Sequence, residues 1–265
     1  MINTKPGIIS PFQLFTLLLT SRISGLAVTN EITVFGFLFQ FALSFVLSGA
    51  AYVISKTNRI SGKVRRAYLT VFCILLTGAT VFTLLDFKER AISLNVPDVF
   101  AAVLLCSAVL YSASLGMEAV ARFSQFSAFI IVAAVFLGTA VNIRRVNNFS
   151  EIRPEIYGIS PLSIIKCFDI PVLYLLYSPY VKGKKEKALA GSVIASYSVS
   201  FVLYLICFFV LKSSAEYYPY PVFTLFQLGE IGSYNKLDIL FTAPLVCALF
   251  VKLSAYLVRV KNENC

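Results

Sequence analysis

The feature that most constrains this chain is a series of apolar runs, each close to twenty residues long. Of its 265 residues, 58% are hydrophobic and only 14% are charged, whereas a soluble domain usually carries about 25% charged residues. The charged residues stand in short clusters between the apolar runs. A helix of about 20 apolar residues crosses the hydrocarbon core of a bilayer. The pattern therefore predicts an integral membrane protein rather than a soluble enzyme.

Helix is the state expected for every run. An open strand would leave backbone N–H and C=O groups unpaired in lipid, and the sequence lacks the segments of about ten residues with alternating polarity that form a membrane barrel. We expect an all-α protein with one transmembrane domain over residues 1–265. The first run contains Pro11, Gln13 and Arg22 and no small-residue cleavage site follows it, so we expect it to remain in the mature protein. The eight expected spans are 8–28, 34–54, 67–85, 97–113, 119–141, 159–181, 189–211 and 237–258.

The basic residues predict that both termini lie in the cytoplasm, because cytoplasmic loops are enriched in Lys and Arg. With this orientation, more basic residues lie on the cytoplasmic side than on the outer side. The basic residues on the outer side are also mixed with acidic residues. The net charge of +10 then follows from topology, and no basic domain face that would bind nucleic acid is expected. The inner set is Lys5, Lys56, Arg59, Lys63, Arg65, Arg66, Arg122, Lys182, Lys184, Lys185, Lys187, Arg259 and Lys261; the outer set is Lys88, Arg90, Arg144, Arg145, Arg153, Lys212 and Lys236.

Several kinds of chemistry are missing from the sequence. It has no histidine, which removes most zinc sites and the histidine-dependent nucleophilic mechanisms. None of the six cysteines forms a CxxC pair, and the five that lie in expected spans are interpreted as packed or lipid-facing thiols. No glycine-rich phosphate loop is present. We expect no cofactor, no metal and no enzymatic activity.

The first candidate site is the polar run from Thr20 to Gly25 in the first span. Ser21, Arg22 and Ser24 place hydroxyls and a charge in an apolar helix, and Gly25 allows the backbone to unwind or to approach a ligand closely. One interpretation is an unwound stretch whose backbone binds a small solute. The alternative is that Arg22 snorkels outward while Gly25 packs against a neighbouring helix.

The second candidate is the segment from Lys166 to Pro171 in the sixth span. Pro171 removes one helix hydrogen bond and clashes with the preceding turn, and Lys166 and Asp169 are spaced so that they can pair on one face. One interpretation is a helix break with Asp169 aimed into a cavity. The alternative is a proline kink with a charge pair near the outer interface.

The two candidates gain meaning as a pair. The first span runs outward and the sixth runs inward, and interrupted helices at corresponding places of two inverted halves mark the binding site of many transporters.

Two further sets of charged residues have structural interpretations. Glu118 and Arg122 are four residues apart and are interpreted as a structural salt bridge. Lys252, near the inner end of the eighth span, is expected to snorkel to the interface.

Three segments in order resemble the B subunit of bacterial spore nutrient-germinant receptors, which belong to the amino acid–polyamine–organocation permeases. They are Ile9–Phe15 followed by Ser21–Gly25, the segment Gly116–Phe123 (GMEAVARF), and a C-terminal region comprising Tyr220–Val222, Ile231–Gly232, Leu237–Leu240 and Phe250–Leu257. The resemblance covers nearly the whole chain.

The resemblance implies a LeuT-like fold of inverted helix repeats, with a binding core of the first, third, sixth and eighth helices. It also implies a small nutrient such as an amino acid, and partnership with the receptor's A and C subunits in the spore inner membrane. The segment 217–234 would be an outer loop that packs as a lid. The family has ten helices, so eight spans would lack the last two. The binding residues it implies are Ser21, Ser24, Gly25, Phe168, Asp169 and Ile170, with helix breaks at Gly25 and Pro171.

Three functions stay open at this point. The chain is expected to be a nutrient-sensing receptor subunit that helps to trigger germination. The alternatives are a secondary transporter that carries an amino acid across the cell membrane, and a truncated inactive copy of either protein. The fold implied by the resemblance is compatible with sensing and with transport.

Overall fold

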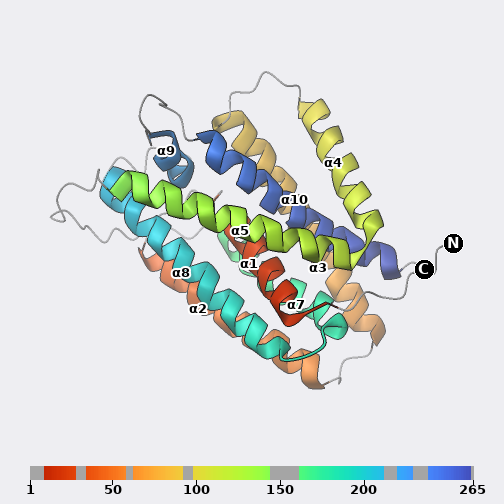
Figure 1. Ribbon diagram of the computed structural model, residues 1–265. Coiled ribbons are helices and arrows are strands. Elements are labelled where there is room, and N and C mark those ends of the chain that lie inside the picture. Colours follow the sequence, from red (N-terminus) through yellow and green to blue (C-terminus); the bar gives the residue numbers. More distant parts are fainter. Residues whose placement is uncertain are drawn as a thin grey trace.

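The computed structural model describes residues 9–27, 34–57, 62–91, 98–143, 161–211, 220–228 and 238–263. These residues form a bundle of helices (Figure 1), and the only β-type pairing among them is an isolated parallel bridge between Ile9 and Val181. The helices are α1 (Pro11–Ala27), α2 (Val34–Thr57), α3 (Gly62–Ala91), α4 (Asp98–Leu115), α5 (Met117–Asn142), α6 (Pro161–Lys166), α7 (Asp169–Tyr177), the 3-10 helix η2 (Ser178–Tyr180), α8 (Lys185–Leu211), α9 (Pro221–Leu228) and α10 (Asp238–Glu263).

Four helices in the described part of the chain are long and apolar enough to cross a membrane. These stretches are Phe35–Thr57, Ala67–Phe87, Met117–Asn142 and Lys185–Leu211. The chain is therefore helical and has the features of a membrane protein, as its sequence predicts. The other expected spans overlap α1, α4, α6 together with α7, and α10. Of these, α4 and α10 contain shorter apolar stretches, Leu105–Leu115 and Thr242–Val258.

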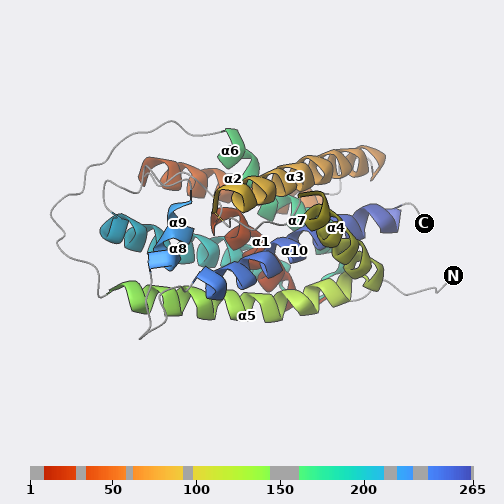
Figure 2. The same ribbon diagram turned by 90° about the horizontal axis from the view of Figure 1, so that it is seen from above.

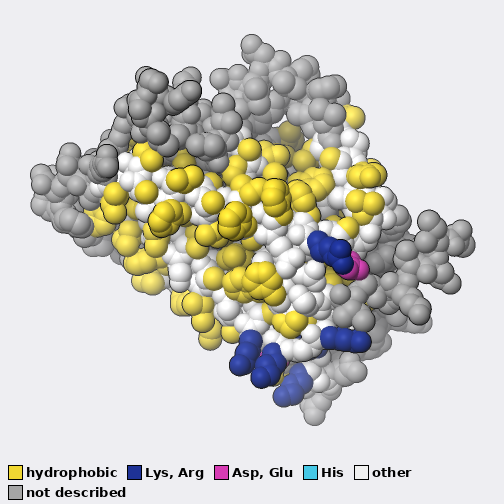
Figure 3. Space-filling model, viewed as in Figure 1, with side chains coloured by type: hydrophobic (Ala, Val, Ile, Leu, Met, Phe, Trp, Pro, Cys, Tyr) yellow, Lys and Arg dark blue, Asp and Glu magenta, His cyan; other side chains and the backbone are white. Residues whose placement is uncertain are grey.

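The surface is apolar where a soluble protein would be polar. Large side chains are widely exposed, including Phe129 at 75%, Phe136 at 72% and Tyr111 at 68%. Hydrophobic side chains cover much of the described face in Figure 3, and the Lys and Arg side chains on this face lie in its lower part and toward the right. Such an exposed apolar surface would be unfavourable in water and is stable against lipid tails.

Helix α1 lies at the centre of the bundle. Figure 2 shows it between a layer made by α2 and α3 and the long helix α5 on the opposite side. It packs against α5, α7, α8 and α10. Its polar residues are consequently enclosed by protein on several sides.

The sequence at the start of α1 explains why the helix begins there. Ser10 and Gln13 form a reciprocal cap, in which the backbone N–H of Ser10 donates to Gln13 Oε1 at 2.9 Å and the N–H of Gln13 donates to Ser10 Oγ at 3.1 Å. Pro11 occupies the first helical position, where its missing N–H costs nothing. The N–H of Ile9 also donates to Tyr180 O at 3.0 Å, which ties the entrance of α1 to the end of η2.

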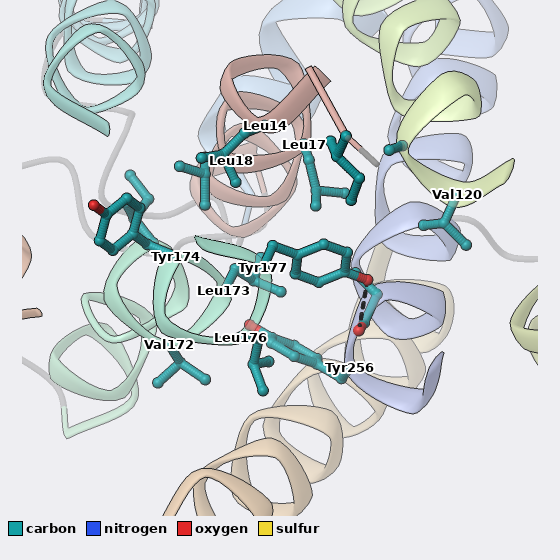
Figure 4. Close-up of a cluster of buried hydrophobic side chains, with 14 of the residues drawn as sticks. Leu14, Leu17, Leu18, Val120, Val172, Leu173, Tyr174, Leu176, Tyr177 and Tyr256 are labelled. Atoms are coloured by element: carbon teal, nitrogen blue, oxygen red, sulfur yellow. Dashed lines mark hydrogen bonds between the residues drawn. The ribbon is translucent and has the colours of Figure 1, made fainter. Parts of the chain in front are cut away.

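One half of the apolar core lies where α1, α7 and α10 meet. Figure 4 shows Leu14, Leu17 and Leu18 of α1 on one side of this cluster, with the side chains of α7 opposite them. The ring of Tyr177 is fully buried and its hydroxyl donates to Ala255 O at 3.0 Å. This contact gives the polar end of the tyrosine a partner inside the core.

A glycine separates α4 from α5. Gly116 has a φ of 94°, a left-handed conformation that residues with a side chain rarely adopt. Directly after it, Arg122 Nη2 contacts Glu118 Oε1 at 2.5 Å, with both side chains exposed. The predicted salt bridge is confirmed, and its exposure fits a minor structural role.

The segment expected to form an outer lid contains a short buried helix in its described part. Helix α9 packs against α5, α8 and α10. The ring of Tyr220 makes an edge contact with Phe87, and its hydroxyl donates to Asp86. Phe226 is buried and lies directly over Gly138 of α5. The rest of 217–234 lies outside the described residues.

The contact between Gly138 and Phe226 predicts a large effect of one methyl group. A Cβ atom at position 138 would overlap the ring of Phe226, so Gly138→Ala is expected to lower the free energy of unfolding by about 1–3 kcal/mol. The matched control is Gly78→Ala, because a Cβ at position 78 meets nothing within 4 Å. Unfolding of both variants in detergent micelles checks this. An equal effect at the two positions would contradict the packing of α9 on α5.

Candidate functional site

The sixth expected span is interrupted in its middle. Helix α6 ends at Lys166, a turn follows at Cys167 and Phe168, and α7 begins at Asp169. The N–H groups of Cys167 and Phe168 close the turn with tight bonds to the carbonyls three residues earlier, at 3.0 and 3.1 Å. Pro171 explains the position of this turn, since it has no N–H for the carbonyl of Cys167 and its ring would clash there. Ser44 of α2 donates to that carbonyl instead, at 3.3 Å.

Arg22 of α1 binds the end of α6. Its Nη1 donates to Lys166 O at 2.7 Å, and its Nη2 donates to Gln40 Oε1 at 3.1 Å and to the hydroxyl oxygen of Tyr197 at 2.6 Å. The guanidinium carbon lies 5.1 Å from the centre of the Tyr197 ring. The last carbonyls of a helix lack partners within the helix, and a cation suits them well. Arg22 is 0% exposed, so the snorkelling alternative is wrong.

A buried ion pair lies beside the same break. Lys252 Nζ of α10 is 2.6 Å from Asp169 Oδ2, and the side chains are 3% and 0% exposed. The hydroxyl of Tyr256 donates to the other carboxylate oxygen, Oδ1, at 2.9 Å. The expectation that Lys252 snorkels to the interface is therefore also wrong. Between buried groups the direct attraction of the ammonium for the carboxylate is stronger than it would be in water.

The break expected at Gly25 is absent. Helix α1 continues through Gly25 to Ala27, where the described part of this segment ends. One glycine in a helix costs only about 1 kcal/mol relative to alanine, which the helical hydrogen bonds and the surrounding packing outweigh. Gly25 instead provides a close approach: a Cβ there would lie 3.4 Å from Asp169 Oδ2 and 3.8 Å from Lys252 Nζ.

These groups surround a recess between four parts of the bundle, which encloses about 330 Å³ between atoms when the space at its mouth is included. Within it, only a water-sized space is clear of side chains. Polar and apolar side chains both line it, and α3, α6 and α10 each contribute both kinds. Its lining comprises Ser24 and Gly25 from α1, Leu76, Ala79, Thr80, Thr83 and Leu84 from α3, Ile165 and Lys166 from α6, Asp169 from α7, and Leu249 and Lys252 from α10.

The structure brings together only some of the predicted binding residues. Ser24, Gly25 and Asp169 line the recess. Ser21 is buried but is not part of the lining. Phe168 stacks on Phe72 of α3, with ring centres 5.3 Å apart, and Ile170 belongs to the apolar core. A direct ligand contact by Ser21, Phe168 or Ile170 is therefore not supported by this geometry.

Two cations were not among the predicted binding residues. Lys252 and Lys166 both line the recess. The sequence feature that could have identified these lysines is their position inside apolar spans, since a charge at membrane depth usually faces protein or water. That signal does not reveal the facing partner, because the partner comes from another helix.

Metal binding and disulfide bonding have no support among the described residues. No group of three or more Cys, Asp or Glu side chains that could hold a metal ion occurs within them. Cys73, Cys106, Cys167, Cys207 and Cys247 form no disulfide bond there. Cys265 lies outside the described ranges.

No protein-family model matches the chain, and no curated protein matches it.

Proposed function

We propose that this chain is the membrane subunit of a spore nutrient-germinant receptor, and that its recess binds a small nutrient such as an amino acid. Binding would favour one conformation of the bundle and so signal to the receptor's A and C subunits. The observation that carries the proposal is the recess itself. It places a helix break, a glycine and a buried ion pair around one recess inside the bundle.

The origin of the lining supports this proposal. The recess is built by α1, α3, α6 with α7, and α10, which correspond to the first, third, sixth and eighth expected spans. The same four helices form the binding core implied by the resemblance to the germinant-receptor B subunits. A shared fold alone would not indicate a shared function, so this correspondence of the site is the stronger argument.

The proposed topology has eight membrane spans in a LeuT-like arrangement, with both termini in the cytoplasm. Exposed basic side chains support the orientation. Lys56 ends α2, Lys182, Lys184 and Lys187 surround the start of α8, and Arg122 lies in the first turns of α5.

A second candidate function is secondary transport of an amino acid. The interruption between α6 and α7 favours it, because many transporters bind their substrate at a discontinuous helix. A receptor would use the same recess without net movement of the solute across the membrane.

Two assays distinguish these functions. Spores of a strain that lacks only this gene should lose the response to one nutrient or to a small set of nutrients. The purified chain in proteoliposomes should not accumulate that nutrient. A normal response to every nutrient tested would contradict the receptor proposal, and nutrient accumulation by the chain alone would favour transport.

Position 25 provides a graded test of the site. Gly25→Ala is expected to preserve the nutrient response, because the added Cβ makes only ordinary contacts with Asp169 and Lys252. Gly25→Leu would place its side chain toward the ion pair and fill the recess. We expect it to raise the nutrient concentration for half-maximal germination about tenfold or more, which corresponds to about 1.4 kcal/mol. The protein level in spore membranes should stay the same in both strains. Equal responses would show that the recess does not bind the nutrient.

Position 171 tests the helix break. Pro171→Ala supplies an N–H that can bond to the carbonyl of Cys167 and removes the clash with it. The variant is expected to join α6 to α7 and to weaken the nutrient response without loss of membrane insertion. A germination dose response together with a membrane fractionation checks this. An unaltered dose response would mean that the break is not needed for sensing.

A further inference from the structure

We propose that the lysines around the start of α8 bind the head group of an anionic phospholipid, and that the neighbouring apolar faces of α2 and α8 contact its acyl chains. This lysine cluster comprises Lys56 at the end of α2 and Lys182, Lys184 and Lys187 around the start of α8. None of the four lines the recess. The cluster is therefore a separate surface, and the inference does not depend on the proposed function.

The lysine cluster is exposed and keeps its positive charge. All four lysines are exposed, and among the described residues none of them forms an ion pair. Lys185 lies between them but faces the protein, where its Nζ donates to Ser178 O at 3.3 Å. Glu186 is the one acidic residue in the segment 182–187. The cluster therefore retains ammonium groups that a phosphate group can balance.

The backbone holds the lysine cluster against the start of α1. Val181 pairs with Ile9 in the parallel bridge, and the N–H of Lys182 donates to Ile9 O at 3.4 Å. Gly183 follows with a φ of 115°, and a Cβ there would lie 3.1 Å from Pro11 Cγ. An ordered backbone loses less entropy when its side chains bind one head group. Topology would require only that the lysines lie on the cytoplasmic side, and it does not account for this ordered turn.

Two helices that are long enough to cross a membrane end at the lysine cluster. They are the apolar stretches Phe35–Thr57 and Lys185–Leu211. Helix α2 packs against α8, and Figure 1 shows the end of α2 and the start of α8 at the same, lower end of the bundle. Lysines at the ends of such stretches reach the level of the lipid head groups. The cluster therefore lies where the phosphate groups of a bilayer are expected.

Exposed apolar side chains continue from the lysine cluster along both helices. On α8, Lys187, Ala190 and Ile194 are exposed on one face, because residues three, four and seven apart lie above one another. On α2, the exposed Val53 lies one turn before Lys56. A phospholipid supplies both an anionic head group and acyl chains, so it matches both parts of this surface. An acidic protein segment would match only the charge.

The test uses a single tryptophan to report which lipid lies beside the lysine cluster. The chain contains no tryptophan, and Ile194→Trp introduces one on the exposed face that Lys187 shares. A phospholipid with brominated acyl chains quenches a tryptophan that it contacts. The full chain is placed in mixed bilayers of phosphatidylglycerol and phosphatidylcholine, with one of the two lipids brominated at a time. We expect phosphatidylglycerol to bind beside position 194 about fivefold or more tightly than phosphatidylcholine, and salt should lower this preference.

Charge variants connect the preference to the lysine cluster. Glutamine at Lys182, Lys184 and Lys187 together should reduce the preference to about twofold or less, whereas arginine at the same positions keeps the charge and should preserve it. Arg122→Gln is the matched control, because Arg122 is an exposed cation on another helix, and it should leave the preference unchanged. Leu110→Trp, without Ile194→Trp, reports from α4, which contains no Lys or Arg. It should show little preference between the lipids.

The outcomes separate a lipid from a protein partner. Equal quenching by the two lipids at position 194 would overturn the inference, and so would a preference that the triple glutamine variant retains. Equal quenching together with a change in emission on addition of polyglutamate would assign the lysine cluster to an acidic protein segment instead. No nutrient enters these measurements, so the proposed function stands after each of these outcomes.

Discussion

Replacing Asp169 with alanine is expected to destabilise the protein by about 3–5 kcal/mol, the largest effect of any single substitution proposed for this chain. The substitution leaves the ammonium group of Lys252 buried, at 3% exposure, without the carboxylate that lies 2.6 Å away. It also removes the acceptor of the Tyr256 hydroxyl. Equilibrium unfolding in mixed detergent micelles, followed by circular dichroism, measures the loss.

A double variant separates the ion pair from general packing. Asp169→Leu combined with Lys252→Met replaces both charges by apolar groups, and exchanges of this kind are often neutral or stabilising. We expect it to recover most of the stability that Asp169→Ala loses. A cost below about 1 kcal/mol for Asp169→Ala would be typical of an exposed pair and would contradict the burial of Asp169 and Lys252.

Arg22→Met is expected to have the second largest effect, about 3 kcal/mol or more. The guanidinium satisfies Lys166 O, Gln40 Oε1 and the Tyr197 hydroxyl oxygen, and each buried polar group that loses its partner costs about 1–3 kcal/mol. Arg22→Lys keeps the charge but cannot reproduce the planar fork of donors. We expect an intermediate loss from it in the same unfolding measurement.

Arg122→Met is the matched control for this prediction. Its side chain is 70% exposed and forms an ion pair with Glu118. Exposed pairs of this kind contribute at most about 1 kcal/mol. Similar losses for Arg22→Met and Arg122→Met would show that the guanidinium of Arg22 does not hold the end of α6.

The bounds of the apolar runs in the sequence predicted the positions of the helices well. In lipid, the apolar run and the hydrogen-bonded helix cover largely the same residues. The run 119–141 corresponds to Met117–Asn142. The run 67–85 underestimates α3, which extends from Gly62 to Ala91. Apolar composition marks the part of a helix that lies among apolar surroundings, whereas the helix continues wherever its backbone stays hydrogen-bonded.

The two candidate breaks show which local signals predict backbone geometry. Pro171 lacks an N–H in every context, so the sequence predicts a disturbed helix just before it, as a break or as a kink; α10 continues through Pro244. Gly25 only permits other conformations, and the packing of α1 against its neighbours keeps it helical. Proline thus predicts a disturbed helix, whereas glycine predicts only that a disturbance is allowed.

The directions of the buried charges were not predictable from the sequence. Arg22 and Lys252 each have a flexible side chain that reaches either the interface or a protein partner. The choice depends on Gln40, Tyr197 and Asp169, which lie on other helices. Only the packing of the helices brings these partners together.

Nutrient binding in the recess is the central claim, and a fluorescence titration tests it most directly. The chain contains no tryptophan, so Phe72→Trp introduces a single reporter where Phe72 stacks on Phe168 at the helix break. The deletion strain identifies the nutrient to which spores without this gene no longer respond. In nanodiscs, this nutrient should produce a saturable change in the tryptophan emission of the Phe72→Trp variant. The change should persist with Gly25→Ala and disappear with Gly25→Leu. Emission that does not respond to this nutrient, or that responds equally with leucine at position 25, would contradict the account.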